Sequence, residues 1–258
     1  MAEKKAMPLD SGVTMTKTAR DLPPRMADRL IVALDVATTA EAEDLVRRLD
    51  GVVSFFKIGF RMLIEPGADS LIDGLISSGK KIFLDAKMFD IPETVKEAVA
   101  TAARRKISFI TVHGDENIMR AATEGRAASD IKVFAVTVLT SLDDDALKAM
   151  GYFLSAQDLV NLRAKKAIEC NCDGIIASAN DDPNAIRRLA EMESLLIATP
   201  GVRQATGSVD DHKRTATPSE AIRNGADYLV VGRPIIAAPD PVAAAKSFIQ
   251  EMEDARPQ

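Results

Sequence analysis

Eight short apolar segments alternate with helical segments along this chain, and this alternation constrains the fold more than any other feature. Short apolar runs bounded by turn residues are typical of buried strands, and strands that alternate with helices form parallel sheets. The runs lie at residues 30–35, 53–58, 81–85, 107–112, 131–138, 174–177, 195–198 and 228–231. We therefore predict an α/β fold with a single (β/α)8 TIM barrel. An open doubly wound sheet is the alternative, but it accommodates six strands better than eight.

The segments between these runs carry the pattern of amphipathic helices. We expect one helix that ends near residue 77, and others at residues 39–49, 91–105, 116–128, 143–150, 156–169, 183–191, 218–224 and 240–253. With 258 residues, of which 47% are hydrophobic, the chain can bury a large core. We expect the barrel, as the catalytic domain, at residues 29–254, after a flexible N-terminal tail at residues 1–28.

Charge and composition argue against several classes of partner. The net charge is −5, basic residues form no run, and aromatic residues make up 4% of the chain with no tryptophan. These features argue against nucleic acid and anionic membranes as partners. No apolar run reaches the ~18 residues of a membrane helix, and residues 1–25 lack the apolar region of a secretory signal.

The cysteines and histidines suggest no metal site. Cys170 and Cys172 are separated by one residue, which is neither a zinc-site spacing nor a disulfide framework. His113 and His212 are far apart in the sequence. We therefore expect reduced cysteines, no bound metal and a cytoplasmic protein.

Polar and charged side chains collect where the expected strands end. They are Asp35, Lys57, Asp85, Lys87, His113, Thr140 and Arg203. In a (β/α)8 barrel the C-terminal strand ends meet at one face, and this face carries the active sites of barrel enzymes. A set of this size at that face predicts a binding or catalytic site.

The densest group of charges follows the third expected strand. Asp85 and Lys87 are two residues apart, so they should project from one face of that strand. Asp90 opens the sequence Asp-Ile-Pro-Glu, which is typical of a helix start with an acidic N-cap. A cap and a surface ion pair worth ~0–1 kcal/mol would explain these residues without catalysis. Their position in the barrel favours a catalytic function.

Two loops that contain glycine and arginine should follow the seventh and eighth strands. They read Thr-Pro-Gly-Val-Arg, ending at Arg203, and Val-Gly-Arg-Pro-Ile, with Arg233 at its centre. Such loops often bind phosphate, because Gly201 and Gly232 allow close backbone approach and the arginines can grip phosphate oxygens. Turn glycines with solvated arginines are the alternative. The polar segment 204–216 has the composition of a mobile lid.

Taken in order, these motifs closely resemble the orotidine 5′-phosphate decarboxylase family of the bacterial type. The resemblance runs from about Leu30 to Met252, nearly the whole chain apart from the tail. It rests on Asp85-x-Lys87-x-x-Asp90-Ile-Pro, Leu34-Asp35, Phe56-Lys57-Ile-Gly59, Leu139-Thr140-Ser141, Thr199-Pro-Gly-Val-Arg203 and Val231-Gly-Arg233. The first motif alone also occurs in a related sugar-phosphate decarboxylase, but the combined set is specific.

The resemblance implies a decarboxylation of orotidine 5′-phosphate to uridine 5′-phosphate (UMP) without a cofactor, the last step of de novo UMP synthesis. It implies a catalytic array of Lys57, Asp85, Lys87 and Asp90. It also implies substrate contacts: Asp35 and Lys57 with the ribose, Thr140 with the pyrimidine, and Arg203, Gly232 and Arg233 with the phosphate. In the family the last aspartate of the array comes from the partner subunit, so Asp90 implies a homodimer, with Ile91 and Thr94 bordering the shared site.

The expected chemistry needs a fixed positive charge. Loss of CO2 from C6 of the pyrimidine leaves a carbanion with no neighbouring electron sink. Lys87 would stabilise this carbanion and then donate a proton to C6, while Asp85 and Asp90 orient the ammonium group. At ~4 Å and an effective dielectric constant near 20, each such ionic contact is worth on the order of 4 kcal/mol before desolvation. Enzymes lower barriers by ~8–23 kcal/mol, so remote binding of the phosphate must supply the remainder.

His212 is a departure from the family pattern. Many relatives carry a glutamine that contacts phosphate near this part of the lid, whereas this chain reads Asp-Asp-His-Lys. Histidine can still donate a hydrogen bond, but its charge varies near neutral pH. We therefore expect the Michaelis constant to depend on pH more steeply in the wild type than in His212→Gln. Identical pH profiles of the Michaelis constant in the two proteins would contradict this prediction.

Two other functions compete with this one. A sugar-phosphate decarboxylase of the same superfamily requires magnesium and an additional carboxylate at the second strand end, where this chain has Lys57. A non-catalytic sensor of phosphorylated ligands could use the same scaffold, because a fold does not determine function. The sensor predicts nucleotide binding without turnover.

Overall fold

The computed structural model describes residues 20–189, 193–205 and 216–256, and its strands form one closed parallel barrel. The strands are β1 (Leu30–Ala33), β2 (Phe55–Gly59), β3 (Lys81–Met88), β4 (Phe109–His113), β5 (Lys132–Val136), β6 (Gly174–Ile176), β7 (Leu196–Pro200) and β8 (Tyr228–Val231). They are hydrogen-bonded in chain order, and β1 also pairs with β8. The predicted single (β/α)8 barrel is confirmed, and the open sheet is excluded because no sheet edge is left between β1 and β8.

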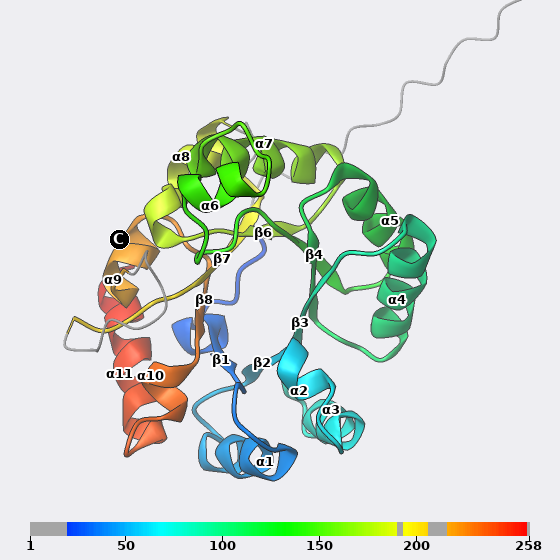
Figure 1. Cartoon of the computed structure of the whole chain (residues 1–258). Coiled ribbons are helices and arrows are strands. Elements are labelled where there is room, and N and C mark those ends of the chain that lie inside the picture. The colour runs from blue at the N-terminus through cyan, green and yellow to red at the C-terminus, as the bar shows by residue number, and fades with distance from the viewer. Residues whose placement is uncertain (1–19, 190–192, 206–215, 257–258) are drawn as a thin grey trace, which may run out of the picture.

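Helices surround the strands in chain order (Figure 1). They are α1 (Thr39–Arg48), α2 (Phe60–Leu63), α3 (Ala68–Ser77), α4 (Pro92–Arg104), α5 (Glu116–Arg126), α6 (Asp144–Ala149), α7 (Ala156–Glu169), α8 (Pro183–Leu189), α9 (Pro218–Arg223), α10 (Arg233–Ile236) and α11 (Pro241–Asp254), with 3-10 turns η1 (Met26–Arg29) and η2 (Ala179–Asp181). The side chains of Thr38, Asp115 and Ser155 accept hydrogen bonds from backbone amides in the first turns of their helices. These caps set several of the predicted starts. The helix expected to end near residue 77 is divided, because Gly67 adopts φ +85° before α3.

Two hydrophobic cores lie on opposite sides of the barrel wall. The larger core fills the space between strands and helices. The smaller core fills the barrel interior and consists of Ile31, Ala33, Phe55, Phe83, Phe109, Phe134, Leu196, Ala198, Tyr228 and Val230. Phe109 is central to it, with ring centroids 4.6 Å from Phe134, 4.8 Å from Phe55 and 5.1 Å from Tyr228. These aromatic rings form a packed floor below the C-terminal face.

Strand periodicity places a polar layer directly above this floor. Successive inward-facing side chains on a strand are two residues apart. Lys57 therefore follows Phe55 on β2, and Asp85 follows Phe83 on β3. On β4, Thr111 follows Phe109 in the same way. The aromatic floor thus supports the polar groups at the end of the barrel where barrel enzymes bind substrate.

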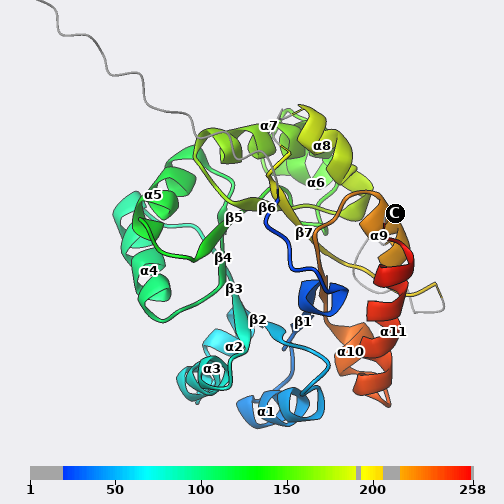
Figure 2. The same cartoon turned by 180° about the vertical axis from the view of Figure 1, so that it is seen from behind.

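The opposite end of the barrel is covered by the segment that precedes β1. Seen from behind, this blue segment crosses the barrel opening (Figure 2). Leu22 packs against the inner core, Met26 is 1% exposed, and Arg20 forms an ion pair with Asp227 at 3.1 Å. Residues 20–28 of the predicted tail therefore pack against the barrel, while residues 1–19 lie outside the described part of the chain.

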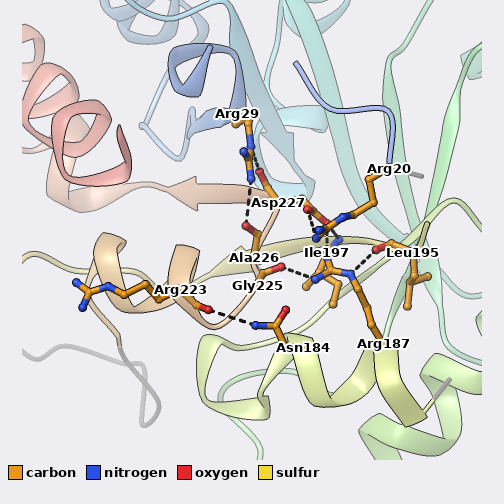
Figure 3. A network of polar contacts seen from close by, with 10 residues as sticks. All are labelled: Arg20, Arg29, Asn184, Arg187, Leu195, Ile197, Arg223, Gly225, Ala226 and Asp227. Atoms are coloured by element: carbon orange, nitrogen blue, oxygen red, sulfur yellow. Dashed lines mark hydrogen bonds and ion pairs between the residues drawn. The ribbon is translucent and has the colours of Figure 1, made fainter. Parts of the chain in front are cut away.

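Arg187 and Asp227 connect α8 to the starts of β7 and β8 (Figure 3). The two side chains form a buried ion pair, and their exposed fractions are 2% and 1%. Arg187 also donates to the carbonyls of Leu195, at 2.9 Å, and Gly225, at 2.7 Å. Asp227 accepts a hydrogen bond from the Ile197 amide at 2.8 Å. Both charges are therefore compensated by partners at the N-terminal ends of the strands.

Among the described residues, no helix combines the length and the apolar character that crossing a membrane requires.

Candidate active site

A cavity of about 580 Å³ opens at the C-terminal end of the barrel. It brings together eight of the predicted site residues: Asp35, Lys57, Asp85, Lys87, Thr140, Arg203, Gly232 and Arg233. They come from β2, β3, α10 and the loops after β1, β5, β7 and β8. Apolar side chains, among them Phe83, Val136 and Ile176, complete the wall. The cavity therefore combines an apolar surface with charged groups at separate positions, which is typical of a small-molecule site.

Four side chains form a row of alternating charges in this cavity. Nζ of Lys57 lies 3.1 Å from Oδ1 of Asp35 and 3.5 Å from Oδ2 of Asp85. Nζ of Lys87 lies 2.8 Å from the same Oδ2 of Asp85. The Lys57 side chain is 10% exposed and that of Lys87 is 44% exposed. Lys87 is therefore the cation of the row that a substrate can reach more readily.

Gly59 allows the first part of this row to form. An added Cβ at this position would lie 2.8 Å from Nζ of Lys57 and 3.1 Å from Oδ1 of Asp35. Any larger residue would compete with both charged groups for the same space. The limited space beside Lys57 and Asp35 therefore explains the glycine at position 59.

Lys87 reaches the cavity through an irregular strand end. Between Leu84 and Met88, β3 advances four residues while β4 advances only two, from Ile110 to Val112. Lys87 itself has φ +46°, in the left-handed region that a non-glycine residue adopts at a cost of ~1–3 kcal/mol. The Asp85 and Lys87 side chains meet, as expected, but β3 extends beyond the expected end at Asp85 to Met88 and is irregular between Leu84 and Met88. The lysine reaches the carboxylate through a bulge in β3 and not through simple alternation along a regular strand.

Asp85 contacts three polar side chains of the site. Its Oδ2 contacts the two lysines, and its Oδ1 accepts a hydrogen bond from the Thr111 hydroxyl at 2.9 Å. Burial raises the pKa of the Asp85 carboxyl, but Lys57, Lys87 and the hydrogen bonds from Lys87 and Thr111 lower it by more, so this pKa lies below its usual value. Asp85 is therefore held as a carboxylate between two ammonium groups.

Thr111 is a site residue that the sequence motifs did not identify. It is 0% exposed, and besides donating to Asp85 it accepts a hydrogen bond from the Lys87 amide at 2.9 Å. The available signal was a hydroxyl residue within the apolar strand Phe-Ile-Thr-Val, two residues after the inward-facing Phe109. That signal could be used only with the knowledge that β4 lies beside β3.

Asp90, Ile91 and Thr94 do not line the cavity of their own chain. All three are exposed, and Ile91 has an exposed fraction of 67%. The prediction that Asp90 caps the following helix is wrong, because Ile91 is the N-cap residue and α4 begins at Pro92. Oδ1 of Asp90 instead accepts a hydrogen bond from the Ile91 amide at 2.6 Å. A residue that precedes proline prefers an extended backbone, and Ile91, which precedes Pro92, has ψ 146°. This preference explains why the helix starts at Pro92.

The two predicted phosphate loops both line the cavity, and a Cβ added at Gly232 would lie 3.7 Å from Oδ2 of Asp35. Gly201 has φ +76°, a conformation that favours glycine, and Arg203 follows this turn. Gly232 precedes α10, whose first residue is Arg233. The Arg203 amide donates to the Ala216 carbonyl at 3.0 Å, so the two ends of the predicted lid segment are joined. The lid residues 206–215, with His212, lie outside the described residues.

His113 stands apart from the other residues at the strand ends. It does not line the cavity. The centroid of its ring lies 4.4 Å from the ring centroid of Phe89, which is in the segment between β3 and α4. Within the described ranges, no group of three or more His, Cys, Asp or Glu side chains is arranged to hold a metal ion.

A comparison with known families identifies the family to which the chain belongs. A family model described as Orotidine 5′-phosphate decarboxylase / HUMPS matches residues 28–248. The chain belongs to this family. Among its relatives, the orotidine 5′-phosphate decarboxylase of Nitrobacter winogradskyi is 49% identical over 228 residues, which are 88% of this chain and 94% of the relative. The enzyme of the same name from Ruegeria pomeroyi is 48% identical over 226 residues, or 87% of this chain and 94% of the relative.

A solved structure of the orotidine 5′-phosphate decarboxylase family has the same fold over nearly the same range. It is the crystal structure of orotidine 5′-phosphate decarboxylase from Lactobacillus acidophilus, with a TM-score of 0.75 and 33% sequence identity. The match covers 87% of this chain and 99% of that structure. The family is named for two groups, orotidine 5′-phosphate decarboxylase and HUMPS. These relatives and the solved structure bear only the first of these names. The predicted resemblance is therefore confirmed over the barrel.

Proposed function

We propose that this protein decarboxylates orotidine 5′-phosphate to UMP and CO2 as the last step of de novo UMP synthesis. The observation that carries the proposal is the row Asp35, Lys57, Asp85 and Lys87 in the cavity of a chain that belongs to this family. Relatives that share close to half of its residues bear the name of this activity. The proposal therefore rests on both side-chain geometry and ancestry.

The cavity offers separate positions for the parts of the nucleotide. Arg203 and Arg233 present guanidinium groups that suit phosphate oxygens, and Gly232 leaves its backbone accessible beside them. Asp35 and Lys57 can pair with ribose hydroxyls because they are a neighbouring acceptor and donor. Thr140 also lines the cavity, where a hydroxyl can bind the polar edge of a pyrimidine.

Lys87 is the group that we assign to the chemical step. The bond between C6 and the carboxylate breaks, CO2 leaves, and the electron pair stays on C6. The ammonium group of Lys87 stabilises this negative charge and then transfers a proton to C6, after which the amine regains a proton from solvent. Asp85, 2.8 Å away and fixed by Thr111, holds the ammonium group in position.

An assay in a chelator tests this function and separates it from its two rivals. Loss of the orotate absorbance band on mixing with orotidine 5′-phosphate is expected without added metal. Activity that disappears in the chelator would favour the magnesium-dependent sugar-phosphate decarboxylase, although Lys57 occupies the position where such a site needs a carboxylate. Tight binding of UMP by folded protein without turnover would favour the phosphate-ligand sensor.

We also propose that the protein is a homodimer with shared active sites. Asp90, Ile91 and Thr94 lie outside their own chain's cavity. Large apolar side chains are exposed in the same region, after β2 and β3: Phe60 at 68%, Ile64 at 73%, Phe89 at 68% and Ile91 at 67%. Exposed apolar side chains of this size favour burial against another subunit. A second copy of the chain would cover them and could receive Asp90.

Mixing two inactive variants tests the shared site. Asp90→Asn and Lys87→Ala should each have very low activity alone, whereas a heterodimer contains one site with both native residues. Random exchange of equal amounts should restore about a quarter of the wild-type activity, because half of the dimers are mixed and each has one intact site. Mass spectrometry should verify the exchange. If exchange is complete and activity stays at the level of the separate variants, each site is built from one chain.

We place the reaction in the cytoplasm. Cys170 and Cys172 are free and buried, and burial raises the pKa of the Cys172 thiol, which keeps it protonated and unreactive. Unpaired cysteines are typical of proteins in a reducing compartment.

A further inference from the structure

Thr111 occupies a position in the polar layer where a side chain has to satisfy two partners at once. It is completely buried and faces the barrel interior directly above the aromatic floor. Its neighbours on β4, Ile110 and Val112, belong to the outer core and contribute nothing polar. A valine would fill the same volume, so packing alone does not explain a hydroxyl here.

The hydroxyl of Thr111 links the two residues closest to the proposed chemistry. It donates to Oδ1 of Asp85 at 2.9 Å and accepts from the amide of Lys87 at 2.9 Å. A hydroxyl group has one proton to donate, and here that proton is used on the carboxylate, while a lone pair receives the amide. One side chain thus contacts both the side chain of Asp85 and the backbone of Lys87.

The backbone of Lys87 needs such support because it adopts an unfavourable conformation. Its φ of +46° falls where the strand register shifts, so no regular ladder bond to β4 holds this amide. Removing the hydroxyl would leave a backbone donor without its partner and release the strained residue. Nζ of Lys87 would then lose its fixed place 2.8 Å from Asp85.

We propose that Thr111 is a positioning residue for the decarboxylation, holding the Asp85 carboxylate and the Lys87 backbone in register through one hydroxyl. This inference rests on the proposed function. Thr111 lies below the charged row, as part of β4, and acts through the two residues that it contacts. Displacements of about 1 Å in such groups can lower rates by ~10²-fold.

Three variants of Thr111 separate the hydroxyl from the packing. Thr111→Val keeps the shape and removes the hydroxyl, Thr111→Ser keeps the hydroxyl, and Thr111→Ala removes both. In the orotate absorbance assay we expect kcat to fall by ~10²-fold in the valine variant, with a much smaller change in the affinity for UMP. The serine variant should recover most of the wild-type kcat. If the valine variant is insoluble, the comparison of alanine with serine serves the same purpose.

Thr137→Val is a matched control. Thr137 is also completely buried, and its hydroxyl donates to the Ile176 carbonyl at 2.7 Å, but it does not line the cavity. This variant loses a buried hydroxyl of the same residue type, so it should lose stability while keeping its kcat. A fall in kcat equal to that of Thr111→Val would show a general effect of destabilisation and would overturn the proposal.

The pH profile provides a readout that a purely structural role would not change. Asp85 faces Lys57 from β2, Lys87 from its own strand and Thr111 from β4, and Asp35 from the loop after β1 pairs with Lys57. The Thr111 hydrogen bond favours the ionised form of Asp85, so its removal should raise the pKa of that carboxyl. The acid limb of the kcat/KM profile should therefore move to higher pH in Thr111→Val and return in Thr111→Ser.

The outcomes distinguish this inference from the proposed function. A wild-type protein without turnover would overturn the function itself. An active wild type with a folded Thr111→Val variant of nearly unchanged kcat would overturn the inference alone. Equal falls in kcat in the serine and valine variants would also overturn it, as would a fall in kcat/KM that is the same at every pH. Neither result would depend on the hydrogen bond from the Thr111 hydroxyl to the Asp85 carboxylate.

Discussion

Replacing Lys87 with alanine is expected to lower kcat by at least ~10⁴-fold, because the variant loses both the charge that stabilises the C6 carbanion and the proton donor. The lysine is the accessible cation of the charged row, 2.8 Å from a carboxylate whose pKa is already lowered. UMP lacks the departing carboxylate, and the arginines that suit its phosphate remain in place. Its affinity should therefore change only by a modest factor.

The comparison requires a lysine of similar exposure outside the cavity. Lys96 on α4 is suitable, because its side chain is 39% exposed and it pairs with Glu124 at 3.8 Å. Lys96→Ala should retain wild-type turnover in the orotate absorbance assay. Substantial turnover by purified Lys87→Ala, free of host enzyme, would refute the assigned role of Lys87. Equal losses of turnover and UMP binding would indicate instead that Lys87 mainly organises the cavity.

Replacing Arg187 with alanine is expected to lower the free energy of unfolding by ~3–5 kcal/mol, because the buried charge of Asp227 loses its principal partner. Arg187 and Asp227 are almost fully buried, and Arg187 also binds the carbonyls of Leu195 and Gly225 (Figure 3). Arg20 also pairs with Asp227 at 3.1 Å, but its side chain is 33% exposed, so it compensates for the loss only in part. Urea unfolding at a fixed protein concentration measures the change.

The neighbouring residue on α8 provides the control. Arg188 is 66% exposed and lies 3.9 Å from Asp182, so Arg188→Ala should change the free energy of unfolding by less than about 1 kcal/mol. Two adjacent arginines of one helix are then expected to differ severalfold in their contribution. A loss below about 1 kcal/mol in Arg187→Ala would mean that water or Arg20 satisfies Asp227 in its absence.

Local patterns were sufficient to predict the barrel and most of its charged site. Strand periodicity alone places Lys57 and Asp85 above the aromatic floor, two residues after Phe55 and Phe83. The bounds of β8 and α7 also agree with the predicted segments, because β8 is an uninterrupted apolar run and Ser155 caps α7. Where one face must be buried and the caps are local, neighbouring residues contain the necessary information.

Predictions were wrong where the backbone departs from regular geometry. The β3 bulge and the positive φ of Lys87 occur together with a hydrogen bond from its amide to Thr111, which is on a different strand. The start of α4 at Pro92 left Asp90 exposed instead of capping the helix. The bulge involves a contact with another strand, which residue spacing does not specify, whereas the helix start follows from the preference of the residue before proline for an extended backbone.

The sequence by itself determined the alternation of strands and helices, the inward face of each strand and the identity of the charged residues at the strand ends, because these follow from periodicities of two and of 3.6 residues. Only the tertiary structure decided that β1 closes on β8, that Thr111 joins Asp85 to Lys87, and that Asp90 does not line the cavity of its own chain. These features depend on the register between strands that are distant in the chain, and that register is set by how the aromatic floor and the outer core pack together.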